Sequence, residues 1–317
     1  MFAVNVENLS RKFKDVLAVD NISFNVKAGE LFGFLGPNGA GKTTTINMLS
    51  TLIRPGSGDA RVMGFDIRKQ RDQVRKSIGV VFQEPALDSR LTGRENLEFH
   101  AMMYSMKKSD RMARIKEVLE LVELTNKAGK KVETYSGGMK RRLEIARGLM
   151  HRPEILFLDE PTIGLDSQTR RHIWDYIKKL NRETGITMML TTHYMEEADY
   201  LCDRILIIDY GKIVALDTPS NLKNILGGDV VDLEIKGANG SCAPLAQEFE
   251  KLEWIKTVKE HECSLSLTMN SGETRIPQLV SIAAGRNIEI SSINLHKPSL
   301  DDVFIHFTGK TIREQAN

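Results

Sequence analysis

The stretch Gly36–Thr44, with the sequence GPNGAGKTT, constrains the fold of this chain more than any other part of it. It matches the pattern G-x-x-x-x-G-K-[ST] of a phosphate-binding loop. The apolar run Leu31–Leu35 precedes it and the helix-like segment Thr44–Leu49 follows it, which is the strand–loop–helix context that the pattern requires. The sequence therefore predicts an α/β fold with this loop between a buried strand and a helix.

The residue types of the loop suit the binding of phosphate. Glycines let several backbone N–H groups turn toward one anion, and the following helix adds its positive N-terminal end. The compact ammonium of Lys42 suits the bridging of two phosphates, and the hydroxyl of Thr43 suits Mg²⁺. The residues that we expect to bind a nucleotide here are Gly36, Pro37, Asn38, Gly39, Ala40, Gly41, Lys42, Thr43 and Thr44.

Composition narrows the class of protein. The 317 residues are 41% hydrophobic and 27% charged, as in globular proteins, and the net charge is +2. Neither this charge nor any basic tract indicates a nucleic-acid partner. No apolar run approaches the roughly 18–20 residues of a membrane span, and no signal peptide is evident, so we expect a cytoplasmic protein. Cys202, Cys242 and Cys263 form no C-x-x-C pair, so neither disulfides nor zinc are expected.

Two carboxylates follow a second apolar run, Ile155–Leu158. Ligands of α/β sheets bind beyond the carboxyl ends of the strands, which is where Asp159 and Glu160 lie. We expect Asp159 to hold Mg²⁺ and Glu160 to polarise a water for attack on the terminal phosphate. The alternative is an Asp that caps a helix and a Glu in its first turn, but Pro161 disfavours a simple helix start.

Gln83 and His193 also follow predicted strands, over Ile78–Phe82 and Thr187–Thr192. A lone histidine is usually structural. A histidine just past a strand, in a sheet that carries a phosphate-binding loop, is a better candidate for contact with the terminal phosphate.

Ser136, Gly137 and Gly138 open a basic helix after a predicted all-helical insertion over about Leu91–Leu124. Ser136 is a suitable N-cap, and two glycines at a helix start can cradle an anion. Taken alone, these residues favour an ordinary junction between a loop and a helix. Phe13, among predicted short antiparallel strands over Met1–Val26, is either a base-stacking aromatic or an ordinary half-buried residue.

The order of these motifs, over about residues 4–217, resembles that of the ATP-binding subunit of an ABC transporter. The sequence YSGGM departs from the common LSGGQ signature at Tyr135 and Met139 but retains Ser-Gly-Gly. The resemblance implies a P-loop NTPase fold with a RecA-like core, an antiparallel β subdomain and a helical subdomain at about residues 87–150. It also implies ATP and Mg²⁺ as cofactors, and a chain that is an ATPase.

The resemblance assigns roles to individual residues. Phe13 would stack on the base, Gln83 would join Thr43 and Asp159 around Mg²⁺, and Lys42, Glu160 and His193 would be catalytic. Two copies would pair head-to-tail in an ATP-dependent homodimer. The residues that would act on the partner's ATP are Ser136, Gly137, Gly138 and, in the D-loop, Asp166.

The sequence predicts three parts of the chain: a nucleotide-binding domain at residues 1–218, a linker at 219–228 and a separate C-terminal domain at 229–317. Its pattern β-α-β-β-α-β is that of a ferredoxin-like α+β domain. The ending SLDDVFIHFTG resembles that of daunorubicin-resistance-type ABC ATPases, which serve ABC-2 exporters. The alternative is an appendage that only stabilises a dimer.

The expected function is therefore an ATPase that powers an ABC-2-type exporter through a separate transmembrane permease, at the inner face of the cell membrane. One alternative is a soluble ABC ATPase without a transporter, but these usually have two such domains or a long coiled coil. An importer ATPase is a second alternative. A module without chemistry is a third, which the intact Lys42, Asp159, Glu160 and His193 oppose.

Overall fold

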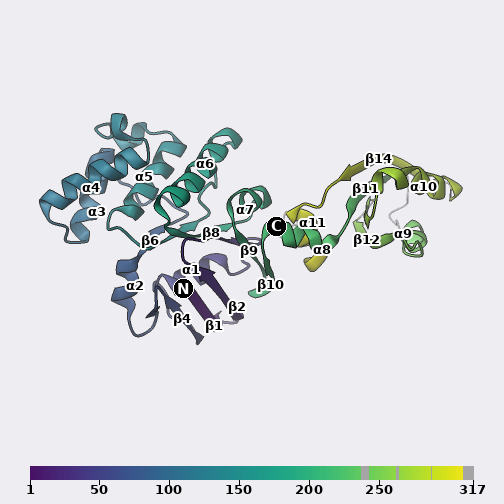
Figure 1. Ribbon diagram of the computed structural model, residues 1–317, viewed down its shortest axis with the longest axis horizontal. Coiled ribbons are helices and arrows are strands. Elements are labelled where there is room, and N and C mark those ends of the chain that lie inside the picture. Colours follow the sequence, from purple (N-terminus) through teal and green to yellow (C-terminus); the bar gives the residue numbers. More distant parts are fainter. Residues whose placement is uncertain (237–242, 262–263, 287, 310–317) are drawn as a thin grey trace. The chain divides into compact units, whose positions relative to one another are not determined.

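A computed structural model describes residues 1–236, 243–261, 264–286 and 288–309. The described chain forms two compact units, Met1–Pro219 and the residues from Ser220 onward (Figure 1). Cys202 is buried with a free thiol, whereas Cys242 and Cys263 lie outside the described residues. None of the helices in the described ranges combines the length and apolar character that crossing a membrane requires.

The first unit contains an antiparallel sheet near its N-terminus. Its first two strands are antiparallel, as predicted. The prediction that they are short is wrong, because each has 12 residues. Val4 of the first strand pairs with Val26 of the second, and Phe13 pairs with Val16, so the two strands stay paired up to the tight turn that joins them. In spatial order the strands are β2 (Val16–Lys27), β1 (Phe2–Phe13), β4 (Ser57–Val62) and β5 (Phe65–Asp66).

The second sheet of this unit is parallel except for one edge strand, β10. Its central strands are mostly apolar and fully buried, as strands covered on both faces are. Because the strands are parallel, their carboxyl ends meet at one edge. In spatial order they are β10 (Lys212–Asp217), β9 (Arg204–Asp209), β3 (Leu31–Leu35), β8 (Thr187–Thr192), β7 (Ile155–Asp159) and β6 (Ile78–Val81).

Helices accompany this sheet and form the predicted insertion between β6 and β7. The insertion holds α3, α4 and α5, which contact one another (Figure 1). Thr92 and Glu95 start α3 with a capping box. The helices of the unit are α1 (Lys42–Leu49), α2 (Arg71–Ser77), α3 (Gly93–Met103), α4 (Lys108–Leu121), α5 (Gly137–Leu149), α6 (Ser167–Thr184) and α7 (Met195–Leu201), with short 3₁₀ turns at Thr125–Lys127 and Val132–Thr134.

The second unit has the predicted ferredoxin-like pattern, because its four strands pair antiparallel in the order β12-β13-β11-β14. Part of the predicted linker, Pro219–Leu226, is a helix. Proline suits its first position, and Gly227, with φ +63°, suits its end. The elements are α8 (Pro219–Leu226), β11 (Asp229–Lys236), α9 (Ala243–Phe249), β12 (Ile255–His261), β13 (Ser264–Met269), α10 (Gly272–Gly285), β14 (Glu289–His296) and α11 (Leu300–Thr308).

Candidate functional site

A cavity of about 270 Å³ lies at the carboxyl edge of the parallel sheet. Three separate segments form its wall: the phosphate-binding loop with the start of α1, the residue that follows β7, and the segment after β6. The lining residues are Asn38, Gly39, Gly41, Lys42, Thr43, Thr44, Gln83 and Glu160. The cavity thus brings together residues that the sequence predicted from three different motifs.

Backbone geometry requires glycine at two positions of the loop. Gly41 has φ +107°, and a Cβ there would lie 2.4 Å from the carbonyl oxygen of Ala18 on β2. A Cβ on Gly36 would lie 2.2 Å from the carbonyl oxygen of Ile208 on β9. The loop is therefore packed tightly against two strands. The first residues of α1 line the cavity, and the N–H groups at a helix start are suited to bind an anion.

The ammonium of Lys42 is held inside the loop. Its side chain is 4% exposed, and Nζ donates hydrogen bonds to the carbonyl oxygens of Gly36 (2.7 Å) and Pro37 (2.9 Å). Burial lowers the pKa of Lys42, while Glu160, whose Oε1 lies 3.6 Å from Nζ, acts to raise it. A phosphate in this cavity would give the buried ammonium a second anionic partner beside Glu160.

Asp159 and Thr43 form an oxygen-rich corner beside this lysine. The hydroxyl of Thr43 lies 3.1 Å from Oδ1 of Asp159, and the hydroxyl of Thr191 donates to the same oxygen at 2.5 Å. Within the described ranges no three Asp, Glu, His or Cys side chains converge as metal ligands. Hydroxyl, carboxylate and amide oxygens of Thr43, Asp159 and Gln83 nevertheless suit Mg²⁺, which takes few protein ligands when phosphates complete its shell.

Glu160 follows β7 in a strained conformation, with φ +45°. Its N–H donates to the backbone oxygen of Thr191 at 3.2 Å and to the hydroxyl of Thr191 at 3.0 Å. Its Oε1 lies 3.3 Å from Nδ1 of His193. Burial acts to raise the pKa of Glu160, but His193 and Lys42 outweigh it and hold the pKa below its ordinary value. Oε2 has no hydrogen-bond partner within the described residues, so an ionised oxygen remains for a water.

Thr191 is a contributor that we did not predict from the sequence. It fixes the carboxylate of Asp159 with its hydroxyl and the backbone of Glu160 with two acceptors. The signal was present, because two threonines follow the apolar residues Met188–Leu190 at the end of β8. Such polar residues at the carboxyl end of a buried strand lie at the ligand edge of the sheet.

The remaining predicted residues are not among those that line the cavity. Ser136 caps α5 as predicted, accepting from the N–H of Met139 at 3.3 Å, and with Gly138 it lines another cavity beside α6. Asp166 is exposed and caps α6 by accepting from Thr169 at 2.9 Å, which lowers the pKa of Asp166. Phe13 is 41% exposed at the end of β1, with the guanidinium of Arg11 4.7 Å from the ring centroid.

Gly137 and Gly138 also have a packing role within the chain. A Cβ on Gly137 would lie 2.9 Å from Leu165, and one on Gly138 would lie 2.7 Å from Thr169. The start of α5 therefore lies directly against Leu165, in the loop before α6, and against the first turn of α6. The sequence indicated these glycines as an anion cradle, but only the fold reveals this close packing.

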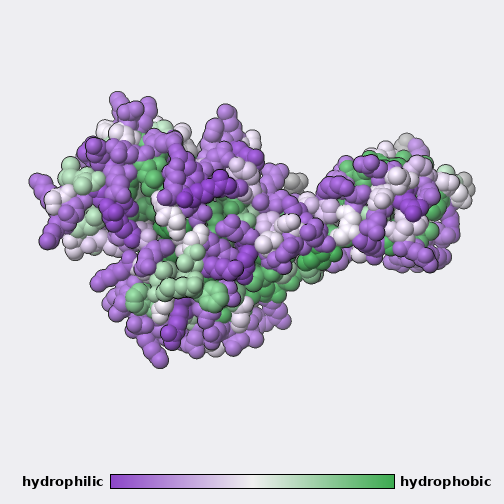
Figure 2. Space-filling view, in the orientation of Figure 1, coloured by the Kyte–Doolittle hydropathy of each residue, from purple (hydrophilic) through white to green (hydrophobic). Residues whose placement is uncertain are grey.

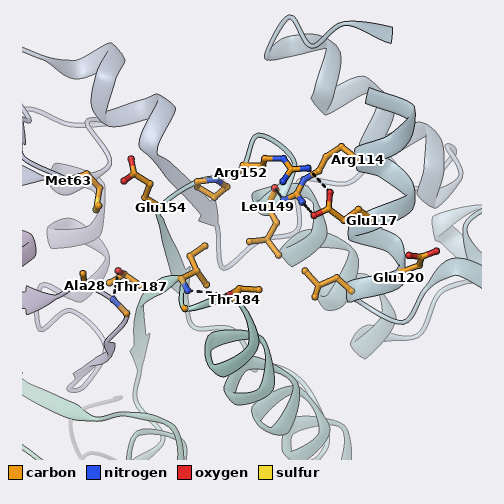
Figure 3. A pocket seen from close by; sticks show the side chains of 15 residues that line it. Ala28, Met63, Arg114, Glu117, Glu120, Leu149, Arg152, Glu154, Thr184 and Thr187 are labelled. Carbon is orange, nitrogen blue, oxygen red and sulfur yellow. Dashed lines mark hydrogen bonds and ion pairs between the residues drawn. The ribbon is translucent and has the colours of Figure 1, made fainter. Parts of the chain in front are cut away.

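A larger cavity, of about 730 Å³, lies at the opposite edge of the sheet, beside the starts of β7 and β8 (Figure 3). Glu117 forms ion pairs there with Arg114 and with Arg152, at 2.5 and 2.8 Å. None of the predicted site residues lines it. Size alone therefore does not identify the candidate site, whereas the convergence of loop, carboxylates and histidine does.

Comparison with known proteins gives matches over both units. Residues 19–163 match the model of the ABC transporter family, and residues 218–308 match that of the ATP-binding protein DrrA1-3-like, C-terminal domain. The linearmycin resistance ATP-binding protein LnrL of Bacillus subtilis is 42% identical over 98% of this chain and 100% of its own length. The daunorubicin resistance ATP-binding protein DrrA3 of Streptomyces coeruleorubidus is 39% identical over 99% of each chain.

A solved relative is the ATP-binding cassette MJ0796, in a dimeric, post-hydrolysis structure with ADP and Pi. It has a TM-score of 0.60 and 32% identity, over 68% of this chain and 98% of that one. The predicted resemblance, fold class and ATPase activity are thereby confirmed. The chain belongs to the ATP-hydrolysing ATP-binding proteins of ABC transporters, in the group that carries a DrrA1-3-like C-terminal domain.

Proposed function

We propose that this ATPase powers an ABC-2-type exporter through a separate membrane permease. The main observation is that both units align along nearly full length with ATP-binding proteins named for resistance to linearmycin and daunorubicin. Resistance of this kind is consistent with removal of the compound from the cell. The cavity supplies the chemistry, since it places Lys42, Gln83 and Glu160 together.

Hydrolysis follows from the charges around the cavity. The loop N–H groups and Lys42 bind the phosphates, and Phe13 stacks on the base. When bound, Mg²⁺, held by Thr43, Asp159 and Gln83, neutralises charge on the phosphate oxygens. Glu160 is ionised, so it accepts a proton as the water oxygen attacks the terminal phosphorus and the bond to ADP breaks.

The position of His193 suits two tasks. Its Nδ1 lies near Oε1 of Glu160, so it restrains that carboxylate, and the ring follows β8 at the edge where the terminal phosphate would lie. It is therefore well placed to orient both the catalytic carboxylate and the phosphate. Thr191 lies two residues before His193. Its hydrogen bonds to the carboxylate of Asp159 and the backbone of Glu160 hold both residues beside that histidine.

A second copy of the chain would complete each site. The cavity lined by Lys42 does not include the residues at the starts of α5 and α6. These are Ser136, Gly137 and Gly138, the anion-binding motif expected at α5, and Asp166, which caps α6. In a head-to-tail homodimer these residues would lie against the partner's ATP. Release of that contact after hydrolysis would couple ATP turnover to the permease.

The helical insertion provides the surface for the permease. Phe99 and Met103 on α3 are 62% and 68% exposed, and Met102 and Met112 nearby are also exposed. Figure 2 shows apolar surface over this end of the insertion, among polar side chains. A short amphipathic cytoplasmic helix of the permease would cover it, since methionine side chains adapt to an apolar partner.

This proposal is tested by co-purification of the chain with a multi-span permease encoded beside it, and by the ATPase rate of the complex. We expect the paired change Phe99→Ser and Met103→Ser to abolish co-purification and leave the ATPase rate of the isolated chain unchanged. The control is Val280→Ser, an exposed apolar residue of α10 in the second unit. If the wild-type chain hydrolysed ATP at its full rate but did not bind the permease, the result would instead favour a soluble ABC ATPase.

A further inference from the structure

Arg141 lies one turn inside α5, after the Ser-Gly-Gly motif, and is only 7% exposed. Its guanidinium leaves the helix toward the parallel sheet. Nη1 donates to the carbonyl oxygen of Phe82 at 2.7 Å, and Nη2 donates to that of Asp159 at 3.0 Å. These two carbonyls belong to the residues immediately before Gln83 and Glu160. One side chain of α5 thus holds the backbone at both places.

The same helix holds the segment after Gln83 from its other end. Glu144, which is fully buried, accepts the N–H of Ala86 at 2.6 Å and pairs with Arg147 at 2.7 Å. Gln83 therefore lies between two anchors, at Phe82 and Ala86, that both come from α5. A movement of α5 relative to the sheet must displace Gln83, because neither anchor can be lost without leaving buried polar groups unpaired.

Charge keeps Arg141 in this place. Burial lowers the pKa of Arg141 to about 10, and the carboxylates of Glu144, Glu197 and Asp159 oppose that fall, so the guanidinium is cationic at neutral pH. Glu197 on α7 is itself fully buried and accepts from Thr162 at 2.7 Å and from Trp174 at 2.8 Å. A neutral side chain would remove a cation from among these buried carboxylates, of which Glu144 would keep Arg147 as its partner.

We propose that Arg141 is a positioning residue that couples the Ser-Gly-Gly motif of one ATP site to the catalytic residues of the other. When Ser136, Gly137 and Gly138 contact the partner's nucleotide, α5 is fixed. Arg141 then fixes the backbone beside Gln83 and Glu160 in its own chain. The inference rests on the proposed head-to-tail homodimer, and it makes the two sites of that dimer hydrolyse ATP cooperatively.

The experiment compares Arg141→Lys and Arg141→Gln with the wild type and with Arg142→Lys and Arg142→Gln as matched controls. Arg142 is the next residue of α5 and also donates to a backbone oxygen, that of Val122 at 3.3 Å, at the end of α4. The measurements on the full chain are the ATPase rate against ATP concentration and the temperature of unfolding.

We expect both Arg141 variants to lower the Hill coefficient for ATP toward about 1. We also expect kcat to fall about tenfold with KM for ATP nearly unchanged, because the P-loop is untouched. Lysine retains the charge but is shorter and lacks the planar fork whose two nitrogens reach the two carbonyls separately, so it should preserve thermal stability better than cooperativity. The Arg142 variants should behave as the wild type. Should Arg141→Gln fail to fold, Arg141→Lys still decides the result.

If Arg141→Lys had the same Hill coefficient and kcat as the Arg142 controls, the inference would be overturned and the proposed function would remain intact. Equal losses in the Arg141 and Arg142 variants would do the same, because they would show only a general role of α5. A wild type that forms no ATP-dependent dimer and hydrolyses ATP without cooperativity would overturn the homodimer and, with it, the coupling.

Discussion

At the scale of single residues, the central feature is Glu160, on whose pKa burial and the neighbouring cations act in opposite directions. Its side chain is 7% exposed, which disfavours an anion, yet Lys42 and His193 keep its pKa below the ordinary value. Its backbone has φ +45°, a conformation that costs about 1–3 kcal/mol outside glycine. Strain of this kind at a carboxylate with one unpartnered oxygen indicates a functional rather than a structural role.

The substitution Glu160→Gln separates these roles. Glutamine retains the shape but not the negative charge, so we expect turnover to fall by about 10²–10⁴-fold. ATP binding should survive because Lys42, Thr43 and Asp159 are unchanged. Steady-state ATPase assays and equilibrium nucleotide binding measure the two effects. The control is Glu154→Gln, at the opposite edge of the sheet. A Glu160→Gln variant with more than about a third of wild-type turnover would exclude the catalytic role.

At the scale of elements, the sequence was informative wherever an apolar run ends in polar residues. Parallel buried strands are continuous apolar runs, and their carboxyl ends share one edge, so Asp159, Glu160 and His193 could be placed before the structure was known. The contacts of Arg141 with Phe82 and Asp159 could not be predicted. They depend on how the helical insertion packs on the sheet, for which a single arginine in a basic helix gives no signal.

The packing inside that insertion predicts a pH dependence. The ring of His100 on α3 lies 5.1 Å from that of Tyr104, and burial, Arg147 and His151 lower the pKa of His100 to about 4. In the unfolded chain a histidine titrates near 6.5, so between the two values the unfolded state binds the extra proton. The stability due to neutral His100 is therefore present above about pH 6.5 and is lost as the pH falls toward about 4.

We expect the free energy of unfolding to fall by about 1–2 kcal/mol from pH 7 to pH 5, after allowance for solvent screening. Urea unfolding at the two pH values measures it. Glutamine does not titrate in this range, so His100→Gln should show a smaller difference between the two pH values. The control is His172→Gln, an exposed position on α6, which should follow the wild type. An unchanged pH dependence in His100→Gln would contradict the assignment to this ring.

At the scale of the whole molecule, the proposed homodimer would build each ATP site from two separate parts of the chain. One part is the cavity lined by Lys42 and Glu160, and the other would be the start of α5 with Ser136 and Gly138, which line a different cavity beside α6. A relative with 32% identity has been solved as a dimer with ADP and Pi. Two copies that pair head-to-tail would join each part with its complement, so nucleotide would belong to the interface.

This arrangement predicts a dimer that depends on ATP and persists when hydrolysis is blocked. The variant Glu160→Gln with Mg²⁺ and ATP should sediment at about twice the 35.7 kDa of one chain, and at the monomer mass without nucleotide. Adding Lys42→Ala should prevent the shift, because the phosphates lose their buried cation. Ser136→Arg should prevent it from the other side, since a bulky side chain at the helix start would obstruct the partner's ATP while leaving ATP binding to the loop intact. If Glu160→Gln stayed monomeric with saturating ATP and the isolated permease, the two parts would not meet in this way, and the trans roles of Ser136 and Asp166 would have to be abandoned.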